Sequence, residues 1–382
     1  MYNDNSDTIN ETETWRKMSS MKTSRSYFRS TAIGEKIYAT GGYNKNAMVL
    51  SSAEVYDSKI DKWSRLPDMK KKREGCAVTS VGGKVYAVGG LDGYRYHASC
   101  EMFDPDTKKW TAIPDMKEAR DRCAACGIGN KLYVIGGYNN YELFSSVVVF
   151  DAATQKWSSL PNMTTKRVGC AAVSVGDKIY VFGGWNGRRN LSSAEVYDTS
   201  TQKWTQLPDM EMCRDECVAT VVANKIYIIG GEDNAKDLSS CCEVFDVYKN
   251  TWSYSLPDME KTRRAFQIAS IGTKIYVMGG ENGRTTTSSV GVFEISMYSI
   301  YPTDKNYVTV EGEYCSPKLL ENLCIDQICR SLPDLDGEFP PGLPQDVINA
   351  ILKSLASHGV LNVTTLKALR RYERDQLPLA GC

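Results

Sequence analysis

The sequence predicts an all-β protein whose main domain is a six-bladed β-propeller, and three observations carry that prediction. First, a short apolar strand with a tyrosine ends in two glycines, as in Tyr180 to Gly183-Gly184, and this stretch occurs six times. Second, the first glycines of successive copies lie 48, 47, 47, 47 and 49 residues apart. Third, a tryptophan followed by a proline-containing loop recurs with the same period.

Each repeat predicts four short strands. In the second repeat the first strand is small and apolar around Cys76, and the next runs from Tyr86 into the glycine pair. The third ends in Phe103-Asp104, and the fourth carries Trp110. Short β-rich runs between turn residues are typical of strands. The glycines suit the crowded propeller axis, where only glycine lets backbones approach closely or take a positive φ.

The two ends of the repeat array fit together. The chain begins with a lone fourth strand at Trp15, and the array finishes with three strands at Phe293-Glu294. The N-terminal strand should therefore complete the last blade, which closes the ring and removes both free edges. This predicts a disordered N-terminus at 1–12, a propeller at 13–297, a linker or short extra strand at 298–316, and a small α-helical module at 317–382.

Composition narrows the class of protein. The chain has 382 residues, 42% of them hydrophobic, with 46 basic and 46 acidic side chains, so it has ample material for a large core. Zero net charge does not favour a general binder of nucleic acids or membrane surfaces. The polar, acidic N-terminal stretch is unlike a signal peptide, and 13 cysteines then indicate reduced thiols in a cytoplasmic or nuclear protein.

The double glycine, the tyrosine before it, the Tyr/Phe-Asp pair and the spaced tryptophan resemble the Kelch repeat. Spacing and Leu-Pro-x-Met loops look most like the Kelch domains of Kelch-like proteins, although only a dozen residues stand where those proteins normally carry BTB and BACK domains. In that family one propeller face binds short peptide segments of partners. The resemblance therefore implies a protein-binding domain.

Residues that recur in register are expected to serve the fold. An arginine lies four residues after each loop methionine, although a basic ring could also bind an anionic ligand: Arg25, Arg73, Arg120, Arg167, Arg214 and Arg263. Cysteines recur on the first strand as small buried fillers: Cys76, Cys123, Cys170 and Cys217. Cys123 and Cys126 have no second cysteine pair at zinc-site spacing, so no metal site is expected.

Residues that do not recur lie in two sets of loops, which should converge on one face around the central channel. Tyrosine, tryptophan and arginine are good binding anchors. We expect a partner-binding face made by Tyr27, Tyr43, Asn44, Tyr94, Tyr96, Arg122, Tyr138, Asn139, Trp185, Arg188, Glu216, Glu232, Arg264 and Glu281. Their uneven charges favour a mixed-charge ligand over a uniformly acidic one. The alternative is that these are ordinary solvated turn residues.

The tail changes periodicity and predicts amphipathic helices. It resembles the SOCS/VHL box of cullin-ligase substrate receptors, through Leu320, Cys324 and Ile328 in a first helix and a later Leu343-Pro344 element. That resemblance implies that the leucine and cysteine insert into elongin C and that the Leu-Pro helix contacts a cullin. The alternatives are a helical cap packed on the propeller, or the opening of a truncated leucine-rich region.

The sequence therefore predicts a non-enzymatic adaptor, the substrate-recognition subunit of a cullin-type ubiquitin ligase. The alternative is a cytoskeletal scaffold that binds actin. Some Kelch-type propellers are oxidases, but that chemistry needs metal ligands. The two histidines, His97 and His358, fall in a blade loop and in the tail, so no catalytic residues, metal or cofactor are expected.

Overall fold

The computed structural model describes residues 14–235, 239–253, 256–259, 262–282 and 285–295, and the strands at 308–310 and 313–315. The chain divides into two units, Met1–Ser296 and Met297–Cys382. The predicted disordered stretch 1–12 and the predicted helical module 317–382 lie outside the described residues. The same holds for the predicted ligase-docking residues Leu320, Cys324, Ile328, Leu343 and Pro344.

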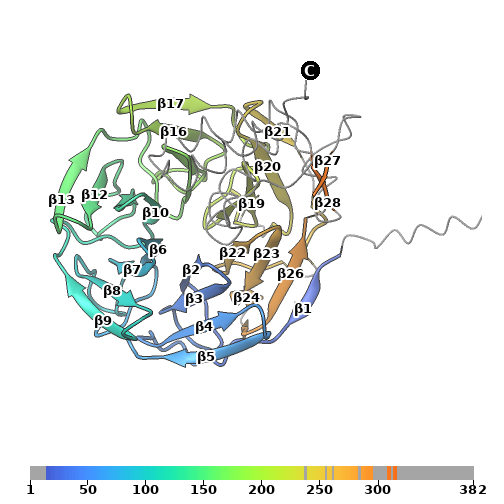
Figure 1. Cartoon of the computed structure of the whole chain (residues 1–382). Helices are drawn as coiled ribbons and strands as arrows, with labels where there is room; N and C mark the ends of the chain where they lie inside the picture. Colours follow the sequence, from blue (N-terminus) through green and yellow to red (C-terminus); the bar gives the residue numbers. More distant parts are fainter. Residues whose placement is uncertain are drawn as a thin grey trace, which may run out of the picture. The chain divides into compact units, whose positions relative to one another are not determined.

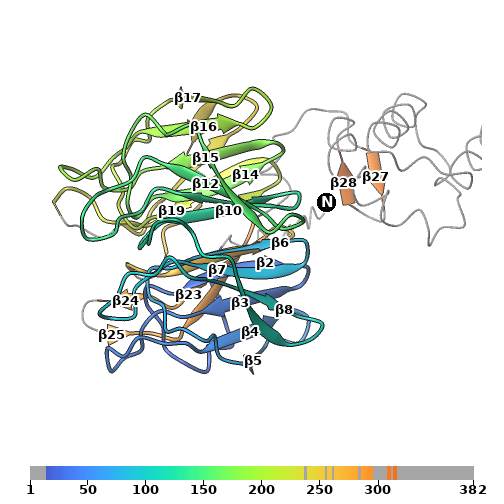
Figure 2. The same ribbon diagram turned by 90° about the vertical axis from the view of Figure 1, so that its left-hand side faces the viewer.

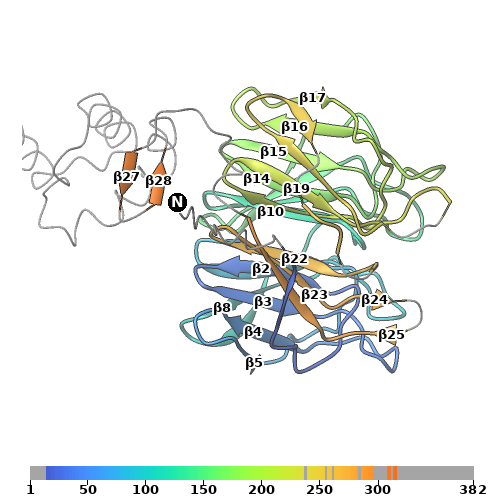
Figure 3. The same ribbon diagram turned by 90° about the vertical axis from the view of Figure 1, so that its right-hand side faces the viewer.

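The first unit is a six-bladed propeller of six four-stranded antiparallel sheets, as the sequence predicted (Figure 1). Within each blade the strands follow one another outward from the centre, and the innermost strands run along the central axis (Figures 2 and 3). Blades 1 to 3 comprise β2 (Arg29–Ile33), β3 (Lys36–Thr40), β4 (Ala53–Asp57), β5 (Lys62–Leu66); β6 (Ala77–Val81), β7 (Lys84–Val88), β8 (Cys100–Asp104), β9 (Lys109–Ile113); and β10 (Ala124–Ile128), β11 (Lys131–Ile135), β12 (Val147–Asp151), β13 (Lys156–Leu160). Blades 4 to 6 comprise β14 (Ala171–Val175), β15 (Lys178–Phe182), β16 (Ala194–Asp198), β17 (Lys203–Leu207); β18 (Val218–Val222), β19 (Lys225–Ile229), β20 (Cys242–Asp246), β21 (Thr251–Ser253); and β22 (Gln267–Ile271), β23 (Lys274–Met278), β26 (Val290–Glu294), β1 (Arg16–Met18).

The N-terminal strand closes the ring. Strand β1 pairs with β26 in antiparallel register, Arg16 opposite Val292 and Met18 opposite Val290. Blade 6 therefore takes its outer strand from the opposite end of the domain, which leaves β26 without a free edge. Strands β24 (Glu281–Asn282) and β25 (Thr285–Thr286) form a small hairpin within the loop that joins β23 to β26.

The repeated tryptophans join neighbouring blades. Each indole N–H donates to a carbonyl in the loop that follows the outer strand of the preceding blade, as from Trp110 to Pro67 at 2.9 Å and from Trp204 to Pro161 at 2.8 Å. The contact continues across the closure, from Trp15 to Pro257 at 3.1 Å. Each tryptophan thus provides an aromatic ring, buried in Trp63 and Trp110 and half-buried in the others, and a polar contact at a blade boundary.

The glycine pairs are required by close backbone approach. Gly89 has a φ of +68°, and a Cβ placed there would lie 2.2 Å from the carbonyl oxygen of Arg120 in the next blade. Gly90 donates its N–H to that same carbonyl at 2.7 Å. Only glycine fits this contact, which explains why the pair recurs in every blade.

The remaining described strands belong to the second unit. In the segment predicted as a linker or short extra strand, β27 (Val308–Val310) pairs with β28 (Glu313–Cys315). In the described part of the chain, no helix has the length and apolar character that crossing a membrane requires.

Candidate binding face

Six residues form a collar around the channel at the start of the inner strands, two positions after each ring arginine: Tyr27, Gly75, Arg122, Gly169, Glu216 and Ala265. All six have a left-handed φ between +47° and +66°. Backbone hydrogen bonds join consecutive members, for example from Gly75 N–H to the Tyr27 carbonyl at 2.9 Å and from Arg122 N–H to the Gly75 carbonyl at 2.8 Å. The collar therefore places its side chains at the mouth of the channel.

Large and small side chains alternate around the collar. Tyr27, Arg122 and Glu216 belong to blades 1, 3 and 5, whereas blades 2, 4 and 6 supply Gly75, Gly169 and Ala265. The space left by the glycines is filled by neighbouring carboxylates, because a Cβ on Gly75 would lie 2.1 Å from Asp121 Oδ1. This alternation lets three large side chains meet at one narrow opening.

The three large collar side chains contact one another. Arg122 Nε lies 3.4 Å from Glu216 Oε1, and the guanidinium carbon lies 5.1 Å from the centre of the Tyr27 ring. Burial lowers the pKa of Arg122, but Glu216, Tyr27 and Asp121 together outweigh this effect and raise it. From inside the channel, Arg29 Nη2 approaches Glu216 Oε2 at 3.8 Å.

Asp121 lies directly before the collar arginine and is 3% exposed. Its Oδ1 has no hydrogen-bond partner in the described part of the chain, and its Oδ2 lies 3.9 Å from Arg122 Nε. Burial raises the pKa of Asp121 to about 7, and the carboxylates of Glu216 and Glu74 act in the same direction. Asp215, the equivalent residue of blade 5, also has a raised pKa because of burial and the adjacent Glu216.

Tyrosines surround this acidic group. The rings of Tyr27 and Tyr43 stack at 5.4 Å, and Tyr138 packs edge-on against Tyr96 with their hydroxyls 3.2 Å apart. Burial raises the pKa of Tyr27 to about 12. A cavity of about 280 Å³ opens among these rings, lined by Tyr27, Tyr43, Glu74, Gly75, Leu91, Asp121, Arg122 and Tyr138. It has space for one long side chain of a partner.

A second ring surrounds the collar. The residue after each glycine pair forms an antiparallel bridge to the residue before the collar position, so Tyr43, Tyr138, Trp185, Glu232 and Glu281 all sit in this ring. Arg264 belongs to the same ring of bridges, and its Nε lies 3.0 Å from Glu281 Oε2. The structure therefore brings together ten predicted residues: Tyr27, Arg122, Glu216, Tyr43, Tyr96, Tyr138, Trp185, Glu232, Arg264 and Glu281.

Trp185 is the most exposed aromatic residue of the second ring, at 37%. The other predicted residues lie farther out on loops, and Tyr94 is 94% exposed. The Oδ1 atoms of Asn44 and Asn139 accept backbone N–H groups of their own loops, which gives both side chains a role in loop shape. Arg188 is exposed, and its backbone N–H is bound by Asn186.

Several residues of the site were missed from the sequence. Glu74, Asp121 and Asp215 each follow a ring arginine directly, and Arg29 lies four positions after one. The first three could have been found from the sequence. They occupy the same repeat position as Arg264, which was predicted to line the binding face. The mouth therefore carries six carboxylates against three guanidiniums: Glu74, Asp121, Asp215, Glu216, Glu232 and Glu281 against Arg29, Arg122 and Arg264.

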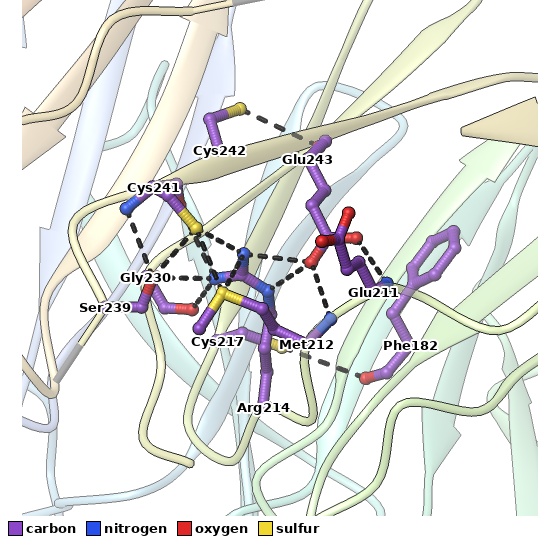
Figure 4. A network of polar contacts seen from close by, with 10 residues as sticks. All are labelled: Phe182, Glu211, Met212, Arg214, Cys217, Gly230, Ser239, Cys241, Cys242 and Glu243. Carbon is purple, nitrogen blue, oxygen red and sulfur yellow. Dashed lines mark hydrogen bonds and ion pairs between the residues drawn. The ribbon is translucent and has the colours of Figure 1, made fainter. Parts of the chain in front are cut away.

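The ring arginines have a structural role in all six blades, as expected, and in blade 6 the half-buried Arg263 donates from Nη1 to the Gly279 carbonyl at 3.2 Å. Arg25, Arg73, Arg120, Arg167 and Arg214 are buried, and each donates from Nη1 to the carbonyl of the first glycine of a pair. Figure 4 shows the blade-5 example, where Arg214 also reaches Glu243 and the Cys241 sulfur. These guanidiniums support loops rather than lining the channel mouth.

The inner-strand cysteines are buried fillers, also as predicted. Burial raises the pKa of Cys76 to about 11 and that of Cys123, Cys170 and Cys217 to about 12. His97 is buried in its blade loop, with Nε2 3.5 Å from Asp92. Among the described residues, no three His, Cys, Asp or Glu side chains are grouped to hold a metal ion.

Comparison with known families identifies the repeat. A family model described as the KLHDC2/KLHL20/DRC7 Kelch-repeats domain matches residues 114–280, and the Kelch motif matches residues 24–70 and 72–117. The chain is also similar in fold to the structure of YjhT, with a TM-score of 0.66 and 15% identity, over 73% of this chain and 97% of that chain. A comparison with curated proteins gave no match.

The described propeller is therefore a six-bladed Kelch-repeat domain. Propellers of this class are typically binding modules without catalysis, which makes a protein-interaction scaffold the general function that the fold suggests. The collar and the tyrosines around it form the candidate binding site of this scaffold, at the mouth of the channel.

Proposed function

We propose that this protein is a protein-interaction adaptor whose collar face binds a peptide segment of a partner. The supporting observation is the mouth cavity, where the almost fully buried Asp121 lies among Tyr27, Tyr43 and Tyr138 and has one oxygen without a hydrogen-bond partner among the described residues. Aromatic rings beside a charged group are typical of anchoring positions in peptide recognition.

The charge of the mouth favours a segment with a basic residue. Arg122 forms an ion pair with Glu216, and Arg264 forms one with Glu281. Asp121 and Glu74 line the cavity, where less positive charge balances their negative charge. A lysine or arginine from the partner would pair with these carboxylates and pack on the tyrosine faces. The exposed Arg188 can contact acidic positions farther along the segment, which fits the mixed-charge ligand expected from the sequence.

We further propose that the tail docks the captured partner to a cullin-type ubiquitin ligase. This step rests on the resemblance of Leu320, Cys324, Ile328 and the Leu343-Pro344 element to a SOCS/VHL box. It makes the protein a substrate-recognition subunit in the cytoplasm or the nucleus. Actin binding by the propeller is the competing proposal.

Affinity purification of full-length protein from cells separates the two halves of the proposal. The double variant Asp121→Asn/Glu74→Gln should lose propeller partners and keep elongin C and the cullin. The double variant Leu320→Ala/Cys324→Ala should lose the ligase subunits and keep the propeller partners. Exposed Tyr248, on the β20–β21 turn, offers Tyr248→Ala as a matched surface control.

Clear outcomes would contradict each half. If ligase subunits never co-purify, or persist in the Leu320/Cys324 variant, the tail assignment is wrong. If partners are unchanged by the Asp121/Glu74 variant, the collar is not the binding face. Co-sedimentation of the wild-type protein with actin filaments, unaffected by the collar variant, would favour the cytoskeletal scaffold instead.

A further inference from the structure

A buried glutamate recurs at the second position of the third strand in four blades, and blade 3 lacks it. This position holds Glu54, Glu101, Val148, Glu195, Glu243 and Gly291 in blades 1 to 6. The four glutamates are buried and pair with the ring arginines. In blade 6, the neighbouring loop residues 260–261 lie outside the described part of the chain.

Each of the four glutamates accepts hydrogen bonds from the same set of donors, which we call the cradle. One carboxylate oxygen accepts from arginine Nη2 at 3.0 Å and from Nε at 3.0–3.4 Å. The other oxygen accepts a backbone N–H of the preceding loop at 2.6–2.8 Å, from Lys22, Lys70, Thr164 or Glu211. Figure 4 shows the filled cradle of blade 5 around Glu243. The protein therefore builds the same carboxylate site four times.

In blade 3 the arginine keeps its place while its carboxylate partner is missing. Arg120 is 1% exposed and donates to the Gly136 carbonyl at 2.8 Å and to Ser146 Oγ at 2.7 Å. Within the described residues, its Nε and the equivalent loop N–H, that of Lys117, make no hydrogen bond. A cavity of about 320 Å³ opens here, lined in part by Arg120, Val148 and Lys166.

Among the described residues, the carboxylates of Glu118 and Glu142 offset part of the Arg120 charge. Glu118 Oε2 lies 3.5 Å from Arg120 Nη2, but the Glu118 side chain is 41% exposed and reaches neither Nε nor the Lys117 N–H. Phe144 contributes a ring 4.4 Å below the guanidinium carbon. These contacts leave Arg120 without the buried carboxylate that pairs with the ring arginines of blades 1, 2, 4 and 5, which is a costly arrangement for a buried cation.

We propose that the blade-3 cradle is a binding site for a carboxylate group supplied by a ligand. The carboxylate would take the place of the missing glutamate, accept from Arg120 Nε and Nη2 and from the Lys117 N–H, and displace Glu118. The cavity has room for a carboxylate on a short chain, and Lys117 and Lys166 line it together with Glu118 and Glu142. This site is separate from the channel mouth and does not depend on the function proposed for it.

Acetate is the probe for the test. Full-length ¹⁵N-labelled protein is titrated with sodium acetate at constant ionic strength set with sodium chloride, and the Lys117 amide and Arg120 Nε–H resonances are followed. We expect saturable shifts of both resonances with acetate and none with acetamide, its neutral isostere. Glu118→Gln should bind acetate more tightly, because it removes the competing carboxylate.

Val148→Glu is the matched variant, because it restores the residue that four blades already accommodate. It should place both resonances near their acetate-saturated positions and abolish the response to acetate. The proposal is overturned if the wild-type resonances do not saturate, if acetamide shifts them equally, or if Val148→Glu responds to acetate as the wild type does. The wild-type comparison of acetate with acetamide decides the matter even if that variant does not fold.

Discussion

Glu195→Val tests how strongly one filled cradle stabilises the propeller. Glu195 is 0% exposed. Its Oε1 accepts from Arg167 Nε at 3.2 Å and Nη2 at 3.0 Å, and its Oε2 accepts from the backbone N–H and Oγ1 of Thr164 at 2.8 and 2.6 Å. The valine copies the natural residue of blade 3, so the sheet itself tolerates it. The perturbation is therefore the loss of four hydrogen bonds around a buried guanidinium.

The expected loss of unfolding free energy is large. Removing one partner of a buried ion pair costs about 3–5 kcal/mol, because the remaining charge stays buried without compensation. Partial relief comes from the Arg167 bonds to the Gly183 and Ser193 carbonyls, which the mutation leaves intact. We therefore expect a loss near the lower end, about 3 kcal/mol. Glu195→Gln keeps the shape and one acceptor oxygen, so its loss should be about half as large.

Equilibrium urea unfolding followed by tryptophan fluorescence measures both variants against the wild type. Because a propeller of this size can depart from two-state unfolding, differential scanning calorimetry should accompany it. A loss below about 1 kcal/mol for Glu195→Val would refute the reasoning, since that is the range of an ordinary exposed ion pair. Equal losses for valine and glutamine would also refute it, because they would point to packing rather than charge.

Three further predictions follow from single contacts. Asp121 has a pKa of about 7 in the fold, above its ordinary value of 3.8, so its contribution to stability falls as pH rises from 3.8 and is lost above 7. Asp121→Asn should raise stability by about 2–4 kcal/mol at pH 8 and by about 1–2 kcal/mol at pH 5, measured by urea unfolding at both pH values. Gly89→Ala places a Cβ 2.2 Å from a carbonyl oxygen and should lower the unfolding free energy by several kcal/mol. Gly129→Ala, also at positive φ but with nothing within 4 Å, should lower it by about 1–2 kcal/mol. Similar thermal midpoints for the two variants would contradict this. Deleting residues 1–18 removes β1 and should lower the melting temperature and cause self-association through the freed edge of β26, detectable by gel filtration and light scattering; a monomer of unchanged stability would show that the closure contributes little.

Much of the candidate site could be located from the sequence because the repeat acts as an internal alignment. Subtracting the recurring positions exposed Tyr27, Arg122 and Glu216, and the structure places all three on the collar. Asn44 and Asn139 lie in the same loops, but their side-chain oxygens accept hydrogen bonds from backbone N–H groups of their own turns. That distinction depends on backbone geometry, which residue type alone does not give.

The sequence by itself determined the architecture, because the glycine pairs, tryptophans and ring arginines are local requirements of each blade that repeat with a fixed period. It also determined the closure, because a lone fourth strand and a three-strand blade complete each other. Only the tertiary structure decided which charges are compensated. Glu216 in blade 5 reaches Arg122 in blade 3 across the axis, Asp121 fits above the bare Cα of Gly75, and Arg120 lacks the glutamate of its counterparts. These relations join residues far apart in the chain, and their energies depend on burial that only the closed ring creates.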